Sequence, residues 1–210
     1  MKSLAIALII SAAAATAGSA KTLTYDFAGN GRTAFGFSFA SEGVTIDVTG
    51  LSYHAGSYRQ ERLTQWDHGF GMSSYWGDSH LIDGYGKQEF VVLSFSEKVD
   101  RIDSLTFDYV DLHDSFCLYG LDADNNAVRL KSTQISDRKS GKVTYLFEED
   151  YAGSYFGVGA LGEKDAFKLR GLTATIEDAP SPVPLPAALP LLAAGLGGLG
   201  AVSRRKRRST

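Results

Sequence analysis

The 210-residue sequence is poor in cysteine and lacks the motifs that mark common enzyme classes. Its single cysteine, Cys117, cannot form an internal disulfide, and its strand-like neighbours predict a buried, unreactive thiol. There is no G-x-S-x-G, H-E-x-x-H or C-x-x-C motif, and the four histidines lack metal-ligand spacing. We therefore expect a protein that is not an enzyme. A glycosidase, which needs only two well-placed carboxylates, stays open as an alternative.

Basic side chains are scarce between the two ends of the chain. Lys2 and the cluster at 204–208 leave 15 basic residues against 24 acidic ones in residues 21–202, a net charge of −9. Binding to nucleic acid requires a basic surface, so we expect no nucleic-acid partner. An acidic body is compatible with an extracellular protein and with binding of a divalent cation.

The N-terminus has the three parts of a secretory signal peptide. Lys2 supplies the positive charge, Leu4–Ile10 the apolar segment, and Ala12–Ala20 a small-residue region with cleavage motifs ending at Ala17 and Ala20. No twin arginine is present. We expect residues 1–20 to be removed by signal peptidase after passage through the general export machinery.

Residues 21–179 contain no convincing amphipathic helix and are expected to form one all-β domain. Ten short aromatic or β-branched runs, separated by Gly, Asp, Asn and Ser, predict a β-sandwich of jelly-roll-like type. In the run 102–110, large residues at Leu105, Phe107 and Tyr109 alternate with polar ones, as in a half-buried strand. The alternation in 166–176 shifts phase at Gly171, which predicts a β-bulge there. The other runs are Thr22–Phe27, Ala34–Phe39, Val44–Tyr53, Glu89–Phe95, Ser115–Leu121, Ala127–Lys131, Lys142–Phe147 and Ser154–Val158.

The stretch between Gly56 and Gln88 is less regular and rich in Trp, Tyr, Gly, His and Asp. Long loops in compact domains tend to be functional, and this many aromatic residues disfavours disorder. Flat aromatic rings pack against the C–H faces of sugars. The candidates for such a saccharide platform are Trp66, Tyr75, Trp76 and Tyr85.

Acidic residues in the same stretch suggest a calcium site. Ca²⁺ is bound by six to eight oxygen ligands, which loop carboxylates and carbonyls can supply. The proposed ligands are Asp78, Asp83 and Glu89, with Asp111 and Asp114 after a neighbouring strand. The alternative is that these carboxylates are solvated loop residues.

The C-terminus combines a proline-rich linker, an apolar run and a basic cluster. Prolines at alternate positions favour an extended backbone over residues 180–187. The apolar run 183–202 contains no charge, and its 20 residues would span about 30 Å as a helix. The positive-inside rule places the basic tail in the cytoplasm. We therefore expect a transmembrane helix over 188–202 and a cytoplasmic tail over 203–210.

This order of features resembles the C-terminal signal of exosortase-sorted proteins of Gram-negative bacteria, in its VPLPA variant. The motif residues are Val183, Pro184, Leu185, Pro186 and Ala187, and the basic residues are Arg204, Arg205, Lys206, Arg207 and Arg208. The glutamate of the better-known PEP-CTERM form is absent. The resemblance implies transient anchoring in the inner membrane, removal of the helix by an exosortase-type enzyme, and delivery to the cell surface or medium.

The body also resembles β-sandwich domains that often precede such tails. The similarity rests on Gly69–Met72, Leu81–Asp83 and the strand Glu89–Phe95. The expected function is that of an exported, non-enzymatic surface or extracellular-matrix protein, for which exopolysaccharide is a candidate ligand. The alternatives are a secreted glycan-active enzyme and an unprocessed single-pass membrane protein.

Overall fold

The described residues between 20 and 177 form β-strands joined by turns, which confirms the all-β prediction. The computed structural model describes residues 20–73, 80–121, 126–136 and 140–177. The strands in these ranges are β1 (Ala20–Asp26), β2 (Arg32–Ala34), β3 (Gly36–Ser41), β4 (Val44–His54), β5 (Ser57–Trp66), β6 (Gly69–Ser73), β7 (Ile82–Asp83), β8 (Gln88–Val99), β9 (Arg101–Val110), β10 (Ser115–Leu121), β11 (Ala127–Gln134), β12 (Gly141–Leu146), β13 (Gly153–Ala160) and β14 (Ala166–Glu177). In the described ranges, no helix has the length and apolar character needed to cross a membrane. The predicted signal peptide and sorting signal lie outside these ranges.

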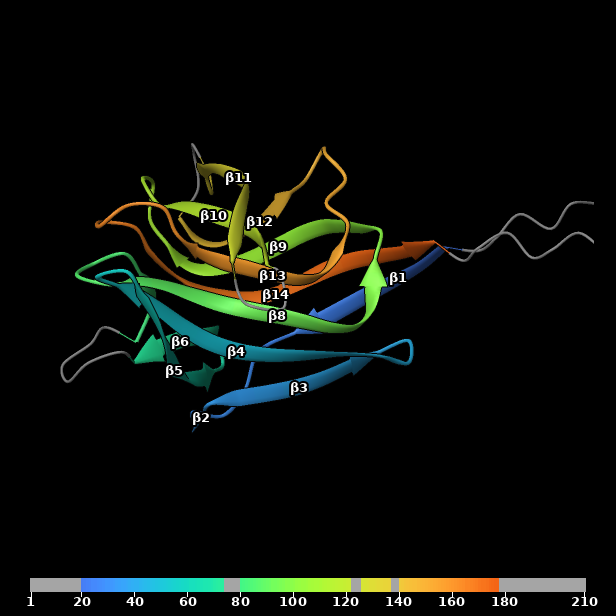
Figure 1. Ribbon diagram of the computed structural model, residues 1–210, viewed down its shortest axis with the longest axis horizontal. Helices are drawn as coiled ribbons and strands as arrows, with labels where there is room; N and C mark the ends of the chain where they lie inside the picture. The colour runs from blue at the N-terminus through green and yellow to red at the C-terminus, as the bar shows by residue number, and fades with distance from the viewer. Residues whose placement is uncertain (1–19, 74–79, 122–125, 137–139, 178–210) are drawn as a thin grey trace, which may run out of the picture. The chain divides into compact units, whose positions relative to one another are not determined.

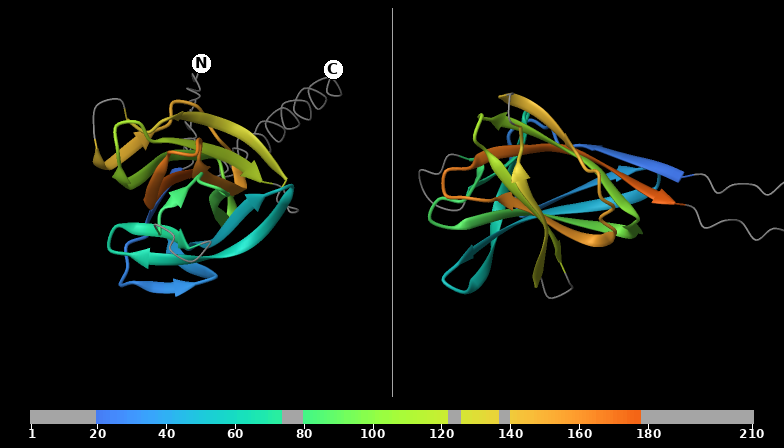
Figure 2. Two further views of the ribbon diagram at one scale, coloured as in Figure 1. Left: turned by 90° about the vertical axis from the view of Figure 1, so that its left-hand side faces the viewer. Right: turned by 90° about the horizontal axis from the view of Figure 1, so that it is seen from above.

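The strands form one continuous path that folds back on itself (Figures 1 and 2). Its order is β11-β10-β13-β8-β4-β5-β6-β14-β9-β12, with β1 and β7 paired to β14, β3 to β4 and β2 to β5. The turning point is β5, which pairs with β4 over residues 57–61 and with β6 over residues 62–66. We call the part from β11 to β4 the first half-sheet and the part from β6 to β12, with β1, the second half-sheet.

The core lies between the two half-sheets. Phe107 on β9 contacts Phe116 on β10 with ring centroids 5.0 Å apart, and Tyr25 on β1 contacts Phe95 on β8 at 6.0 Å. Phe70 on β6 is fully buried among the rings of Phe27, Phe37 and Phe39. Burial of aromatic side chains contributes most per residue to the stability of such a core.

Several sequence predictions are confirmed in detail. Each of the ten predicted runs lies within a strand to within one residue, except that the run 34–39 is divided between β2 and β3. Strand β14 has a register shift against β9 between Leu169 and Gly171, where the bulge was expected. Cys117 is a buried free thiol, and burial raises its pKa above the ordinary value.

The prediction of a long irregular region at 56–88 is wrong for most of its length. It contains β5, β6 and β7, and only residues 74–79 of it lie outside the description. The first four residues of β5 are exposed and burial begins at Glu61, where the strand passes from one half-sheet to the other. A strand that changes its surroundings midway has no uniform alternation for sequence analysis to detect.

Candidate functional site

A two-residue turn between β5 and β6 places an aromatic ring and two polar side chains beside β14. Trp66 and Gly69 are paired across the turn, which consists of Asp67 and His68. Gly69 has a φ of 103°, and a side chain there would overlap the backbone of Leu169 and Arg170. Glycine is therefore required at this position, because only it permits this conformation and this close approach.

Lys168 on β14 lies between two aromatic rings. Its Nζ is 5.2 Å from the ring centroid of Trp66 and 4.9 Å from that of Tyr109. The residue is 7% exposed, and in the described part of the chain its ammonium has no hydrogen-bond or ion-pair partner. Burial lowers the pKa of Lys168, and the carboxylates of Asp67 and Asp108 offset only part of this effect.

Tyr109 is on the outside of the protein, contrary to the alternation that places it with Leu105 and Phe107. Its φ of 60° turns the end of β9 over, so that the ring is 52% exposed while Val110 is buried. A positive φ is unfavourable for a bulky side chain, so the surrounding structure must hold it in place, and such strained residues cluster at functional sites. The ammonium of Lys168 lies over the ring of Tyr109. The rings of Tyr109 and His68 are nearly perpendicular, at 88°, with their centroids 4.9 Å apart.

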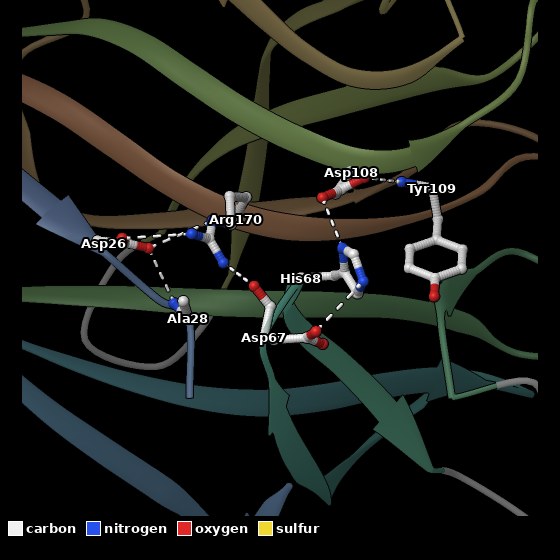
Figure 3. A network of polar contacts seen from close by, with 7 residues as sticks. All are labelled: Asp26, Ala28, Asp67, His68, Asp108, Tyr109 and Arg170. Atoms are coloured by element: carbon white, nitrogen blue, oxygen red, sulfur yellow. Dashed lines mark hydrogen bonds and ion pairs between the residues drawn. The ribbon is translucent and has the colours of Figure 1, made fainter. Parts of the chain in front are cut away.

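His68 is held between two carboxylates (Figure 3). Its Nδ1 is 3.0 Å from Asp108 Oδ2, and its Nε2 is 3.5 Å from Asp67 Oδ2. Because an ionised carboxylate only accepts hydrogen bonds, Nδ1 donates to Asp108. The described contacts of His68 are thus these two carboxylates and the ring of Tyr109. We call Trp66, His68, Asp108, Tyr109 and Lys168 the aromatic–lysine site.

A polar groove continues from this site over the outer side of the second half-sheet. Arg170 donates to the backbone oxygen of Asp67 and forms an ion pair with Asp26, with Nε 3.4 Å from Oδ1 (Figure 3). The groove has a volume of about 220 Å³. Its polar lining is Thr24, Asp26, Thr106, Lys142, Thr144, Arg170 and Thr173. The groove therefore offers hydroxyl groups and charges of both signs next to the rings of Trp66 and Tyr109. Such groups can donate hydrogen bonds to, and accept them from, a ligand that is rich in hydroxyl groups.

The predicted saccharide platform is only partly reproduced. Trp66 belongs to the aromatic–lysine site, with 37% of its surface exposed. Tyr85 is exposed but lies at the opposite end of β5 from Trp66. Its neighbour Gly86 accepts a hydrogen bond from His54, and His54 is paired with Ser57, the first residue of β5. Tyr75 and Trp76 lie outside the described residues. The two described members therefore do not form one surface.

The proposed calcium ligands mostly accept hydrogen bonds from the backbone. Glu89 Oε2 accepts from the Asp83 amide at 3.2 Å, and Asp83 Oδ1 accepts from the Tyr85 amide at 3.0 Å. Asp114 accepts from the amides of Asp111 and Ala166. No group of three or more His, Cys, Asp or Glu side chains that could hold a metal is found among the described residues. Asp78 lies outside them, and the site that includes it stays a prediction.

Comparisons with known proteins show no family. No family model matches the chain, and no curated protein matches it. Among solved structures, the second family 29 carbohydrate-binding module, as a D83A mutant with mannohexaose, aligns over 76% of this chain and 93% of its own, with 14% identity and a TM-score of 0.35. The family 32 module of Clostridium perfringens NanJ, with galactose, aligns over 62% and 93%, with 5% identity and a TM-score of 0.34. A further family 32 module from Clostridium perfringens, with GalNAc-beta-1,3-galactose, aligns over 42% of this chain and 66% of its own, at 12% identity and a TM-score of 0.31. The sugars in these structures are ligands of those proteins.

Proposed function

We propose that this is an exported, non-enzymatic surface or matrix protein whose β-sandwich body binds a saccharide at the aromatic–lysine site. The observation that carries the proposal is the ammonium of Lys168, which lies between Trp66 and Tyr109 without a hydrogen-bond partner in the described part of the chain. The side chain is largely buried, but its Nζ is not among the described buried atoms that lack a partner, so it still reaches solvent. Aromatic faces attract such a cation by about 0.5–2 kcal/mol and leave its N–H groups free to donate to a ligand. A sugar hydroxyl placed between the rings would supply an acceptor.

The rest of the site supports a neutral sugar. Trp66 and Tyr109 offer exposed ring faces for C–H groups, and His68 and Asp108 offer polar groups beside them. The carboxylates of Asp67 and Asp108 would repel an acidic sugar at this position. A glycan-active enzyme on the same scaffold is the second candidate, because the two carboxylates beside His68, those of Asp67 and Asp108, are the kind of group that glycoside hydrolysis uses.

Replacing Lys168 by methionine should abolish or strongly weaken saccharide binding without reducing the stability of the fold. Methionine keeps the length of the side chain between the rings, and removing a buried charge that lacks an ion-pair partner is often neutral or stabilising. Binding is measured by affinity electrophoresis and calorimetry against neutral glucans, mannans and galactans. Trp66→Ala should weaken the same binding about tenfold or more.

Two controls make this experiment decisive. Lys98→Met and Phe35→Ala alter an exposed lysine and an exposed aromatic residue away from the site and should leave affinity unchanged. If Lys168→Met lowers the unfolding midpoint and leaves binding intact, Lys168 is structural and the proposal is wrong. Release of reducing ends from any of the polymers would establish the enzymatic alternative.

We further propose that the C-terminal segment is a temporary anchor, removed by an exosortase-type enzyme. The support is the order of motif, apolar run and basic cluster in residues 183–208. Mass spectrometry of the mature protein should find a C-terminus within 183–187, and a variant with Pro184→Ala and Pro186→Ala should keep its full tail. A wild-type protein that ends at Thr210 after export would instead be a single-pass membrane protein.

A further inference from the structure

The outer side of the second half-sheet carries polar side chains on four neighbouring strands. On β9, Thr106 lies between Leu105 and Phe107, which face the core, so Thr106 points outward. On β12, Thr144 points outward beside the buried Val143 for the same reason. The polar groove lies on this face, and its lining residues come from β1, β14, β9 and β12.

The β-bulge at Gly171 lies in the middle of the polar groove. Strand pairing puts four residues in one row across the sheet: Asp26, Gly171, Thr106 and Thr144. Gly171 has no side chain, so the row is open between Asp26 and Thr106. The opening is fixed by the fold, because a Cβ atom on Gly171 would lie 2.5 Å from the carbonyl oxygen of Tyr25. Bulges of this kind are common next to functional sites.

The hydroxyl groups of the groove keep hydrogen-bonding capacity for a ligand. The hydroxyl oxygens of Thr106 and Thr144 are 3.0 Å apart, and those of Ser104 and Thr173 are 2.7 Å apart. A hydroxyl group has one O–H to donate and two lone pairs to accept. Each pair therefore keeps one O–H and several lone pairs beyond the hydrogen bond that its members share. A row of sugar hydroxyls, which also donate and accept, matches these groups.

Arg170 joins the groove to the aromatic–lysine site. Its guanidinium donates to the backbone oxygen of Asp67 in the β5–β6 turn, and its Nε pairs with Asp26 in the groove (Figure 3). Lys168 is two residues before Arg170 on β14 and therefore points to the same side of the sheet. The site and the groove are neighbouring parts of one outer surface.

This surface is longer than a single sugar. Lys168 is paired with Asp108, and Thr173 is paired with Ser104, four residues away along β9. Four residues of a strand span about 13 Å. A pyranose ring, with bonds of about 1.5 Å, is much shorter than this. A saccharide that contacts both Lys168 and Thr173 must therefore be a chain.

We infer that the ligand is a chain of neutral sugars, with one unit in the aromatic–lysine site and the following units in the polar groove, an extension that rests on the proposed function of that site. Tyr25, the one aromatic residue among the described lining residues of the groove, is only 3% exposed. The following units are therefore held by hydrogen bonds to Thr106, Thr144 and Arg170 rather than by stacking. The protein recognises a polysaccharide strand in preference to a free monosaccharide.

A length series tests this inference. Calorimetry measures the affinity for gluco-, manno- and galacto-oligosaccharides, each from the monosaccharide to the hexasaccharide. In a series that binds, affinity should rise about tenfold or more from the monosaccharide to the hexasaccharide, because the further units form hydrogen bonds in the groove. Equal affinity at all lengths would overturn the extension into the groove and leave the proposed function standing. A protein that binds none of the three series would contradict the proposed function itself.

A double variant, Thr106→Val and Thr144→Val, removes one hydroxyl pair and keeps the shape of both side chains. Because both members of the hydrogen bond are replaced, neither hydroxyl is left without its partner. The variant should weaken binding of the hexasaccharide about fivefold or more and that of the monosaccharide less. Thr133→Val on β11, in the first half-sheet, is the matched control and should bind every length as the wild type does.

Lys168→Met separates the two parts of the surface. It should weaken binding at every length, including the monosaccharide, because it changes the aromatic–lysine site itself. The threonine double variant should instead show a loss that grows with chain length. An equal loss for monosaccharide and hexasaccharide in the double variant, or no loss for either, would overturn the inference.

Discussion

Replacing Gly71 by alanine should lower the free energy of unfolding by at least about 3 kcal/mol. Gly71 is in β6, and a Cβ atom there would overlap the carbonyl group of His80 and come within 3.4 Å of the Leu81 α-carbon. Both contacts are with backbone, which cannot rotate away as a side chain can. The segment is also held by a hydrogen bond from the Met72 amide to the Leu81 carbonyl at 3.3 Å. The alanine variant must therefore displace either β6 or the segment 80–81.

Gly43→Ala is the matched control for this experiment. Gly43 has a φ of 82° and no atom within 4 Å of the added methyl group, so its replacement costs only the backbone strain, about 1 kcal/mol. Urea unfolding followed by tryptophan fluorescence measures both variants. Equal losses at the two positions would contradict a close approach of β6 to residues 80–81.

Replacing Phe70 by alanine should lower the free energy of unfolding by about 4 kcal/mol. The ring is fully buried, and its centroid lies 4.9 Å from that of Phe37, 5.3 Å from Phe27 and 5.9 Å from Phe39. These rings come from β3, β6 and the segment after β1, so the cavity would loosen contacts between several elements. Surrounding strands can collapse only partly into such a cavity, which adds to the lost hydrophobic transfer energy.

Phe35→Ala provides the comparison, because this ring is 49% exposed and its loss should cost less than about 1 kcal/mol. Phe70→Leu should fall between the two, since leucine fills most of the space. Chemical denaturation at one pH and salt concentration allows the three values to be ranked. A Phe70→Ala variant as stable as Phe35→Ala would contradict the assignment of Phe70 to the centre of this cluster.

Much of the fold could be predicted from the sequence because most strands have one environment along their length. The runs at 44–53, 102–110 and 166–176 lie on long strands that alternate between core and surface, and their apolar periodicity is clear. Strand β5 was missed since its environment changes where it passes between the half-sheets. Its first half has exposed residues and only its second half faces the core.

The candidate site could be predicted only at Trp66. His68 and Asp108 are 40 residues apart, and nothing in their spacing indicates that a turn and a strand end will meet. Tyr109 was placed on the core side by its alternation with Leu105 and Phe107, and its positive φ reverses this. Local periodicity describes which face a residue takes on a regular strand, but it contains no information on backbone conformations imposed by tertiary contacts.

The first and last residues of the described body lie next to each other, which bears on how the domain can be joined to other proteins. Ala20 and Glu177 are directly paired, at the outer ends of β1 and β14, so that the chain enters and leaves side by side (Figure 1). Adjacent ends of this kind allow circular permutation and insertion into a surface loop of another protein. The unit 20–177 could therefore be moved between host proteins as a cassette, with its strand order and both of its outer faces unchanged.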